Sequence, residues 1–265
     1  MSDTSTPRVL ADYQLIGRHI IVTGAGQGIG RAICELVLDL GGTVTAVDLN
    51  EDHLANLQRE YGSDRVLTVV GSVSDPATAQ QAVEEAVAVK GAVHGLVNNA
   101  GISRTAMIEK MTLETWSSVI DVHLNGSFYF LKAVGSHMRT RAVAGEQRPG
   151  AIVNISSDAG RRGSIGQINY SAAKSGIFGL TMSAAREWAK HGIRVNTVGF
   201  GVVETPMTEV IRGEKFRDTY IAQIPLGRWA EANEVAKPVC FLLSEAASYI
   251  TGQHISVNGG FTIGV

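Results

Sequence analysis

Short apolar runs alternate along most of the chain with longer stretches in which apolar residues recur at helical spacing. The run His19-Ile20-Ile21-Val22 is typical of a buried strand, and Ile33, Val37 and Leu40 predict a helix over residues 30–40. Further strands are expected over residues 43–47, 66–70, 93–97, 151–155, 193–198 and 254–257. Further helices are expected from about residue 51, from Asp75-Pro76, and over 113–138, 169–190, 207–221 and 231–244.

This order of elements indicates the fold class. Repeated strand–helix–strand units favour an α/β protein with one doubly wound parallel sheet of the Rossmann type and helices on both faces. No proline-rich or charged linker divides the 265 residues, so we predict a polar N-terminal arm over 1–14 and a single domain over 15–265. The stretch Thr140–Gly150 contains two glycines and a proline and indicates a loop. Ligands bind such sheets at the carboxyl ends of the strands.

Composition narrows the class of protein. Hydrophobic residues form 45% of the chain and charged residues 18%, which excludes a disordered chain, and the formal charge of −2 indicates no nucleic-acid or anionic-lipid partner. We expect a cytoplasmic protein, because no secretion signal and no apolar run of roughly 20 residues is present. The only cysteines, Cys34 and Cys240, exclude a disulfide scaffold, and no metal site is expected.

A glycine-rich turn, Thr23-Gly24-Ala25-Gly26-Gln27-Gly28-Ile29-Gly30, joins the first strand to the first helix. Gly24 permits a tight turn, Gly28 lets the backbone approach a pyrophosphate, and Gly30 lets the helix pack close to the strand. The helix N-terminus then presents N–H groups to the phosphates. Because strand and helix flank it, the motif predicts a dinucleotide site that also includes Gln27 and Ile29.

An acidic residue ends the second expected strand. Asp48 follows Gly30 by eighteen residues, where a carboxylate can accept hydrogen bonds from both adenosine ribose hydroxyls. The same charge repels a 2′-phosphate, and no Arg or Lys lies in the glycine turn. We therefore predict NAD(H) rather than NADP(H) as the cofactor. The alternative is that Asp48 only caps the following helix.

A tyrosine and a lysine share one face of a later helix. Tyr170 and Lys174 stand at i and i+4, so the ammonium is expected to lower the pKa of the phenol and make it an acid/base group. Ser157 follows a strand thirteen residues earlier, where its hydroxyl can hold the substrate oxygen beside Tyr170. The alternative for Tyr170 and Lys174 is an ordinary surface pair.

From Gly17 to Gly260 the sequence resembles the short-chain dehydrogenase/reductase family. The motifs are Thr23–Gly30, Asn98–Gly101, Ser157, Tyr170–Lys174 and the tail from Thr251-Gly252-Gln253 to Asn258-Gly259-Gly260. The resemblance implies that Tyr170 is the catalytic acid/base, Lys174 its electrostatic helper and ribose ligand, and Ser157 the group that orients the reacting oxygen.

Other cofactor contacts rest on the same resemblance. Asn98, Asn99 and Gly101 are expected on the adenosine ribose side, and Val203 and Thr205 at the nicotinamide carboxamide. The family is usually tetrameric, which implies a homotetramer with interfaces on the helices 113–138 and 169–190.

Three departures from the family pattern stand out. His123 replaces an Asn that helps to hold a water in a proton relay; it either replaces the Asn there, with a pKa near 6.5, or is only a packed helix residue. Ser72 and Val73 stand where an Asp and an apolar residue commonly contact adenine. Phe200 stands in a usual Pro position and adds an aromatic face near the nicotinamide or substrate.

The substrate is expected to contact the loops after the fourth, fifth and sixth strands and the segment 205–224. Besides Ser157, the residues expected there are Asp158, Gln167 and Arg104. The predicted function is hydride transfer between NAD(H) and a secondary alcohol or ketone, of the 3-hydroxyacyl/3-oxoacyl or the polyol type. The alternative is a non-catalytic NAD-binding regulator or structural protein that keeps this fold.

Overall fold

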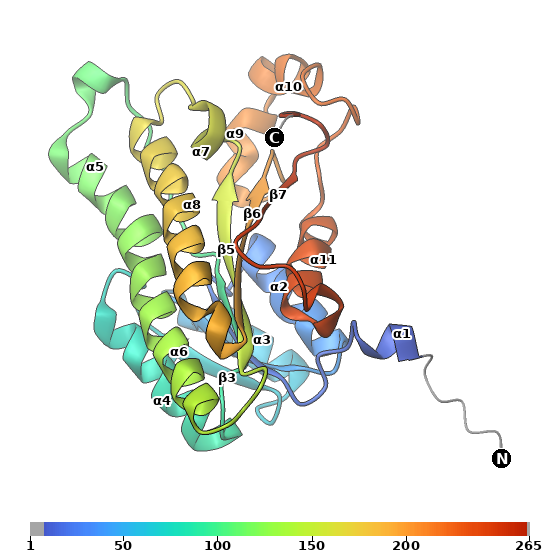
Figure 1. Cartoon of the computed structure of the whole chain (residues 1–265). Coiled ribbons are helices and arrows are strands. Elements are labelled where there is room, and N and C mark those ends of the chain that lie inside the picture. Colours follow the sequence, from blue (N-terminus) through green and yellow to red (C-terminus); the bar gives the residue numbers. More distant parts are fainter. Residues whose placement is uncertain (1–7, 264–265) are drawn as a thin grey trace.

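The computed structural model describes residues 8–263 and confirms the α/β prediction. Seven parallel strands form one sheet in the order β3-β2-β1-β4-β5-β6-β7, with helices on both sides (Figure 1). The strands are β1 (His19–Thr23), β2 (Thr43–Asp48), β3 (Val66–Val70), β4 (Gly95–Asn98), β5 (Gly150–Ser157), β6 (Ile193–Phe200) and β7 (His254–Val257). Strand order reverses between β1 and β4, so their carboxyl ends flank a crevice.

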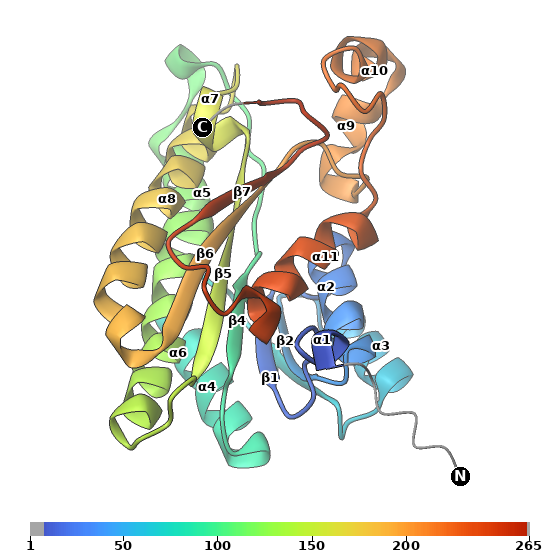
Figure 2. The ribbon, with the colours of Figure 1, turned by 45° about the vertical axis from the view of Figure 1, so that its right-hand side comes forward.

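Alternating side chains of β1 face two separate layers of helices. Ile20 and Val22 pack in one apolar cluster, whereas Ile21 packs in the other. Figure 2 shows the two helical layers on either side of the sheet. The first cluster is covered by α2 (Gly28–Asp39), α3 (Glu51–Tyr61) and α11 (Ala232–Leu243), and the second by α4 (Pro76–Lys90), α6 (Gly126–Val143) and α8 (Ile168–Trp188). Both cysteines are free and buried.

The helix expected over 113–138 is not continuous. It consists of α5 (Leu113–Ile120) and α6, joined by a π-helical turn over Asp121–Asn125. Such turns are frequent at functional sites, because they shift the side chains that follow. Helix α6 also runs on to Val143, so the loop expected from Thr140 starts four residues later.

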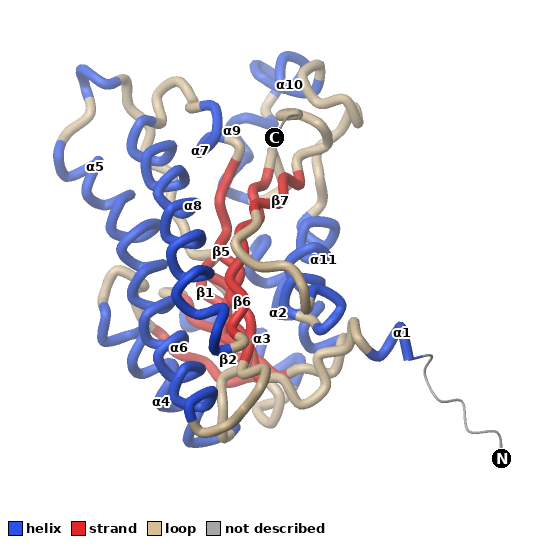
Figure 3. Tube along the Cα trace, in the orientation of Figure 1, coloured by secondary structure: helices blue, strands red, loops and turns tan. Residues whose placement is uncertain are grey.

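The other differences lie near the chain's ends and the upper rim of the sheet. The helix expected over 207–221 is divided by Gly213 into α9 (Glu209–Arg212) and α10 (Glu214–Ile221), which Figure 3 shows as separate segments. Within the expected N-terminal arm, a short helix α1 (Arg8–Ala11) precedes Asp12, whose carbonyl accepts a bond from Ala246 N–H at 3.0 Å. Residues 1–7 of that arm lie outside the described residues. The described part also contains α7 (Ala159–Arg162), and no described helix is both long enough and apolar enough for a membrane span.

Buried neutral histidines make the stability of this fold sensitive to acid. His19 is 2% exposed and bonds the hydroxyls of Thr43 and Thr45, and burial lowers its pKa to about 3. The pKa of His94 is lowered to about 4, mainly by burial and then by the charges of Arg141 and Arg18. The unfolded chain binds protons near pH 6.5 and the folded chain does not, so stability is full above pH 6.5 and falls as pH drops toward 3.

We therefore expect chemical denaturation to show a lower free energy of unfolding at pH 4 than at pH 7. His19 alone accounts for about 3 kcal/mol of this loss, at roughly 1.4 kcal/mol per pH unit. His94 is less buried than His19, so its contribution to the loss of unfolding free energy is smaller. The variant His19→Asn is expected to flatten the dependence, whereas His53→Asn, which alters a partly exposed histidine on α3, is the matched control. Equal stability at the two pH values would contradict this explanation.

Candidate active site

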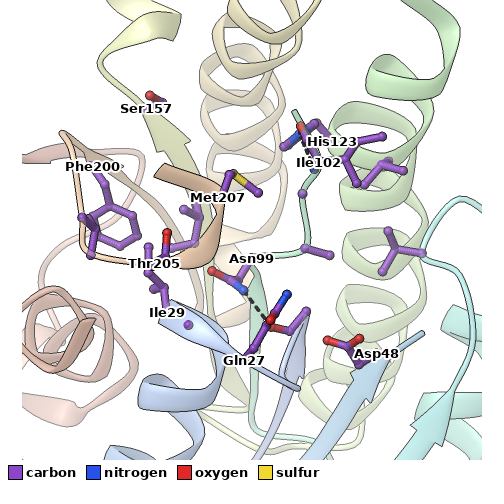
Figure 4. A pocket seen from close by; sticks show the side chains of 18 of the residues that line it. Gln27, Ile29, Asp48, Asn99, Ile102, His123, Ser157, Phe200, Thr205 and Met207 are labelled. Carbon is purple, nitrogen blue, oxygen red and sulfur yellow. Dashed lines mark hydrogen bonds between the residues drawn. The ribbon is translucent and has the colours of Figure 1, made fainter. Parts of the chain in front are cut away.

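One cavity of about 360 Å³ lies at the carboxyl ends of the strands, in the crevice between β1 and β4. Figure 4 shows Asp48 and Ser157 at opposite ends of it, with Gln27, Asn99 and Thr205 between them. Most of the expected site residues line this cavity: Gly24, Gln27, Gly28, Ile29, Asp48, Ser72, Val73, Asn99, Gly101, His123, Ser157, Tyr170, Lys174, Val203 and Thr205. Five expected residues do not line it: Gly30, Asn98, Arg104, Asp158 and Gln167.

The glycine turn has the close approaches that its sequence predicts. Gly24 has a φ of +64°, and a Cβ there would lie 2.8 Å from the Ala100 Cα. A Cβ on Gly30 would lie 2.0 Å from the Gly24 carbonyl oxygen, so Gly30 serves helix–strand packing without lining the cavity. Gly28 has a φ of +55° and begins α2, whose N-cap residue Gln27 makes no capping bond with its side chain. The turn therefore offers uncapped N–H groups beside the cavity, which fits the phosphates of a dinucleotide.

Asp48 lies at the far end of this cavity and does not cap the next helix. Its Oδ2 accepts the Gly26 N–H at 2.9 Å and its Oδ1 accepts the Asn50 N–H at 3.0 Å. The N-cap of α3 is instead Asn50, whose side chain accepts the His53 N–H. Each carboxylate oxygen retains a second lone pair, so Asp48 can still accept bonds from a vicinal diol.

Asn98, the last residue of β4, and Asn99, the residue after it, have different places. Asn99 lines the cavity, and its side chain bonds the carbonyls of Thr23 and Gly24 at 3.0 and 3.2 Å, which joins this loop to the glycine turn. Asn98 was expected at the cofactor, but it is 4% exposed and lies under the site. Its amide bonds Ser127 O and Asn154 Oδ1, because the side chain points from β4 into the layer between β5 and α6.

Ser157, Tyr170 and Lys174 meet at the other end of the cavity. Ser157 ends β5, and Tyr170 and Lys174 lie one turn apart on α8. The Ser157 hydroxyl and the Tyr170 hydroxyl are hydrogen-bonded. The Lys174 Nζ lies 5.8 Å from the centre of the Tyr170 ring and donates to Ile155 O at 2.7 Å. Lys174 is 4% exposed, so the alternative of a surface pair is wrong.

The expected direction of the Tyr170 pKa is also wrong for this structure. Burial raises the pKa of the phenol, and the hydrogen bond from Ser157 only opposes that rise. Lys174 does not reverse the effect, because burial lowers its own pKa to about 7 and its ammonium is directed to the carbonyl of Ile155. Deprotonation of Tyr170 therefore needs further positive charge beside it.

His123 lies in the π-helical turn and is 2% exposed. Its Nε2 lies 3.0 Å from the N–H and 2.8 Å from the carbonyl of Ile102, and its ring packs edge-on against Tyr170 with centroids 5.0 Å apart. No described group bonds Nδ1. Burial, and then the charge of Lys174, lowers the His123 pKa to about 3, which disagrees with the alternative of a relay histidine that titrates near pH 6.5.

The remaining cofactor candidates line the cavity, but some of them already contact neighbouring residues. The Ser72 hydroxyl lies 2.7 Å from the hydroxyl of Ser74, so it is already engaged at the cavity edge. Val73 is 8% exposed and packs against α6 at Gly126. Thr205 lines the cavity beside Gly28, where a Cβ would lie 3.3 Å from the Thr205 Cγ2. Phe200 also lines the cavity, as its position at the end of β6 indicated.

Three of the expected substrate contacts are not at the cavity. Asp158 is 3% exposed, and its Oδ1 accepts a bond at 2.9 Å from Asn258, so it ties the C-terminal tail to β5. Burial raises its pKa. Arg104 is exposed and bonds the Ser103 carbonyl, and Gln167 precedes α8 with its side chain outside the cavity lining. Of the expected substrate residues, only Ser157 lines the cavity.

Several lining residues had no separate prediction. Met207 and Thr208 follow Thr205 in a short 3₁₀ turn, and Ile102 follows Gly101. Their signal was their position after β4 and β6, since the loops there were expected to reach the substrate. The full set is Val47, Leu49, Gly71, Ala100, Ile102, Val122, Ile155, Ser156, Gly201, Pro206, Met207 and Thr208.

Comparisons with known proteins agree with this geometry. A family model described as Enoyl-(Acyl carrier protein) reductase matches residues 24–262. The 3-oxoacyl-[acyl-carrier-protein] reductase FabG of Thermotoga maritima is 41% identical over 252 residues, which cover 94% of this chain and all of that protein. The chain belongs to the short-chain dehydrogenase/reductase family. It is therefore an oxidoreductase of this family.

Other members of the family differ in what their names state. Acetoacetyl-CoA reductase of Synechocystis is 39% identical, with 91% of this chain and 94% of that protein covered. Gluconate 5-dehydrogenase from Burkholderia cenocepacia, solved with NADP and tartrate, has a TM-score of 0.90 and 31% identity, with 97% of this chain and all of that chain covered. A glucose/ribitol dehydrogenase from Brucella melitensis has a TM-score of 0.87 and 32% identity, covering 94% and 98% of the two chains.

Proposed function

We propose that this protein is an NAD(H)-dependent dehydrogenase/reductase that interconverts a secondary alcohol and a ketone. The observation that carries the proposal is one continuous cavity with Asp48 and the glycine turn at one end and Ser157, Tyr170 and Lys174 at the other. The first group fits the adenosine and phosphates of a dinucleotide. The second fits an alcohol or carbonyl oxygen. A nicotinamide dinucleotide bound here would supply the hydride acceptor or donor.

The chain's own residues would handle the proton. Ser157 and Tyr170 share a hydrogen bond, so both hydroxyls can converge on one substrate oxygen. Tyr170 would take the alcohol proton in oxidation and return it to the carbonyl oxygen in reduction. Lys174 is buried one helical turn away, and the positive charge of its ammonium would favour the phenolate against the opposing effect of burial.

NAD(H) is preferred in this proposal because of the charge at Asp48. A 2′-phosphate would meet that carboxylate in a partly buried place, and unit charges about 4 Å apart repel by about 4 kcal/mol at an effective dielectric of 20. The neighbours Leu49 and Asn50 supply no cation. The Burkholderia relative was solved with NADP, so the family itself does not decide this point.

The substrate class that we propose first is a 3-oxoacyl or 3-hydroxyacyl thioester. The relatives at 39–41% identity are named as reductases of such compounds. Ile102, Phe200 and Met207 give the cavity an apolar wall, which suits an acyl chain. A polyol is the second candidate, because gluconate 5-dehydrogenase shares the fold at a TM-score of 0.90.

Assembly and location follow the family in this proposal. We propose a cytoplasmic homotetramer with interfaces on α5, α6 and α8. Apolar side chains exposed on these helices support it: Leu113, Phe128 and Met182 are 85%, 47% and 51% exposed in the single chain.

The proposed function is tested first by fluorescence titration with NADH and NADPH, followed by a substrate panel. We expect tighter binding of NADH and turnover of acetoacetyl-CoA or its 3-hydroxy counterpart. Turnover of polyols alone would move the substrate class to the second candidate. Tight NADH binding without turnover of any alcohol or ketone would favour a non-catalytic binding protein. Preference for NADPH would contradict the role of Asp48.

His123 is proposed as a positioning residue that holds Ile102 and Tyr170 while it stays neutral. Only one of its Ile102 bonds can form at a time, since Nε2 either accepts or donates. An asparagine could serve both backbone groups, so His123→Asn is expected to keep kcat within about threefold of the wild type. His123→Leu loses the bond that Nε2 makes to Ile102 and should lower kcat about fivefold, at about 1 kcal/mol for the lost bond, with little change in KM.

The pH profile separates positioning from a titrating role. With a His123 pKa of about 3, the acid limb of kcat above pH 5 should be the same in the wild type and His123→Asn. An acid limb near pH 6.5 that disappears in His123→Asn would show that His123 titrates during turnover. A collapse of kcat in His123→Asn would show chemistry specific to the imidazole.

A further inference from the structure

A second cavity lies at the opposite end of the sheet from the active site. It has a volume of about 450 Å³ and is lined where β1, β4, β5 and β6 begin, at the side of Figure 2 away from α7 and α10. The C-terminal end of α11 and the following residues 245–251 complete its wall. Its lining includes Arg18, His94, Arg148, Arg194 and Glu245.

The charged groups of this cavity are mostly positive. Three guanidinium groups and one carboxylate line it, and the carboxylate is already engaged. Glu245 accepts a bond from Arg18 at 2.9 Å through Oε1 and from Arg148 at 2.7 Å through Oε2. Arg194 is fixed by bonds to the carbonyls of Leu242 and Ser244, at 2.8 and 2.9 Å. An excess of fixed positive charge therefore stays in the cavity.

Three polar groups of the cavity wall have hydrogen-bond donors to offer. The Nδ1 of His94 accepts the His19 N–H at 3.2 Å, so in the neutral ring the proton is on Nε2, for which the described residues supply no acceptor. The Arg148 side chain is 68% exposed and uses one of its nitrogens for Glu245. The oxygen of Thr251 accepts the Val195 N–H at 3.1 Å, which leaves its hydroxyl proton to donate.

We propose that this cavity binds a small organic polyanion, of the phosphate-ester or polycarboxylate class. A cationic concave site with N–H and O–H donors matches a ligand that has several acceptor oxygens and more than one negative charge. The volume exceeds what a single inorganic phosphate fills, and His94 and Arg194 lie in its partly buried wall, within reach of a small molecule. No part of this site takes part in the proposed oxidoreductase reaction.

The test is isothermal titration of the full-length protein with pyrophosphate and, separately, with citrate. We expect one site with a Kd below about 1 mM for at least one of the two probes. Arg148→Gln should weaken that binding about tenfold or more, because a charge-assisted hydrogen bond from the guanidinium to the anion is lost. Glu245→Gln should strengthen it, because Arg18 and Arg148 are then free to bind the anion.

Opposite effects of these two variants cannot come from a general loss of stability. Arg139→Gln, an exposed arginine of α6 outside the cavity, makes the same change in net charge and should leave the Kd unchanged. The proposal is overturned if neither probe binds at 10 mM. It is also overturned if Arg148→Gln has no effect, which would place the anion elsewhere, for example at the glycine turn, or if Arg139→Gln weakens binding equally.

Discussion

Replacing Tyr170 with Phe is expected to lower kcat by about 10²–10⁴-fold while the affinity for NADH stays within about twofold. The variant removes one hydroxyl and keeps the ring that packs against His123 at 5.0 Å. Ser157 would then hold the substrate oxygen without a partner to give or take its proton. The hydroxyl lies beside Ser157, which Figure 4 shows at the opposite end of the cavity from Asp48, so dinucleotide binding should not depend on it.

The measurement combines steady-state kinetics with the NADH titration on the same preparation. Tyr61→Phe is the matched control, because it removes a phenol hydroxyl on α3 outside the cavity, and it should keep full activity. Loss of both turnover and NADH binding in Tyr170→Phe would indicate a disturbed fold. Retained turnover would show that another group carries the proton and would refute the acid/base assignment.

In the proposed reaction, the burial of Tyr170 favours alkaline pH in the oxidative direction. The phenol pKa is raised by burial, and the ammonium of Lys174 has a pKa lowered to about 7. In the free protein at neutral pH, Tyr170 is therefore a protonated phenol rather than a base, and Lys174 carries only part of its positive charge. Positive charge brought by oxidised nicotinamide beside Tyr170 would oppose the rise in the phenol pKa.

Local motifs were the part of the site that could be predicted from the sequence. The glycine turn, and the Tyr170–Lys174 pair one helical turn apart, are fixed by short-range geometry. Their position at one sheet edge follows from the parallel order of the strands. Ser157 ends a strand whose neighbour across the sheet is β6, so its place in the cavity was also predictable.

Contacts between distant segments explain the errors. Asp158 looked like a loop residue beside the substrate, but its partner Asn258 lies 100 positions later, and only the folded tail reveals that bond. Asn98 bonds Asn154, which lies 56 positions away in the neighbouring strand. The π-helical turn that carries His123 has no local sequence signal, because the apolar pattern of 113–138 continues through it. These features depend on packing among β4, β5, α6 and the C-terminal tail.

Replacing Asp48 is expected to have the second large effect, on the choice between NADH and NADPH. Asp48→Ala removes the charge that would face a 2′-phosphate, so the ratio of kcat/KM for NADH to that for NADPH should fall by about 10²-fold or more, since repulsion of about 4 kcal/mol is removed. The absolute kcat/KM with NADH should fall as well. Two backbone donors, Gly26 N–H and Asn50 N–H, lose their acceptor, and the glycine turn loosens with them.

Asp48→Asn separates the effect of the lost charge from the effect of the lost backbone hydrogen bonds. The amide keeps one acceptor oxygen for a backbone N–H but has no charge, so it should shift the cofactor ratio almost as far as Ala and lose less activity with NADH. Asp39→Asn, which removes an exposed charge at the end of α2, should leave the ratio unchanged. If both Asp48 variants kept the wild-type ratio, Asp48 would serve only to order the turn between β2 and α3. In that event Asp48 would give no reason to expect a preference for NAD(H), and reduction of a 3-oxoacyl substrate with NADPH would become the favoured function.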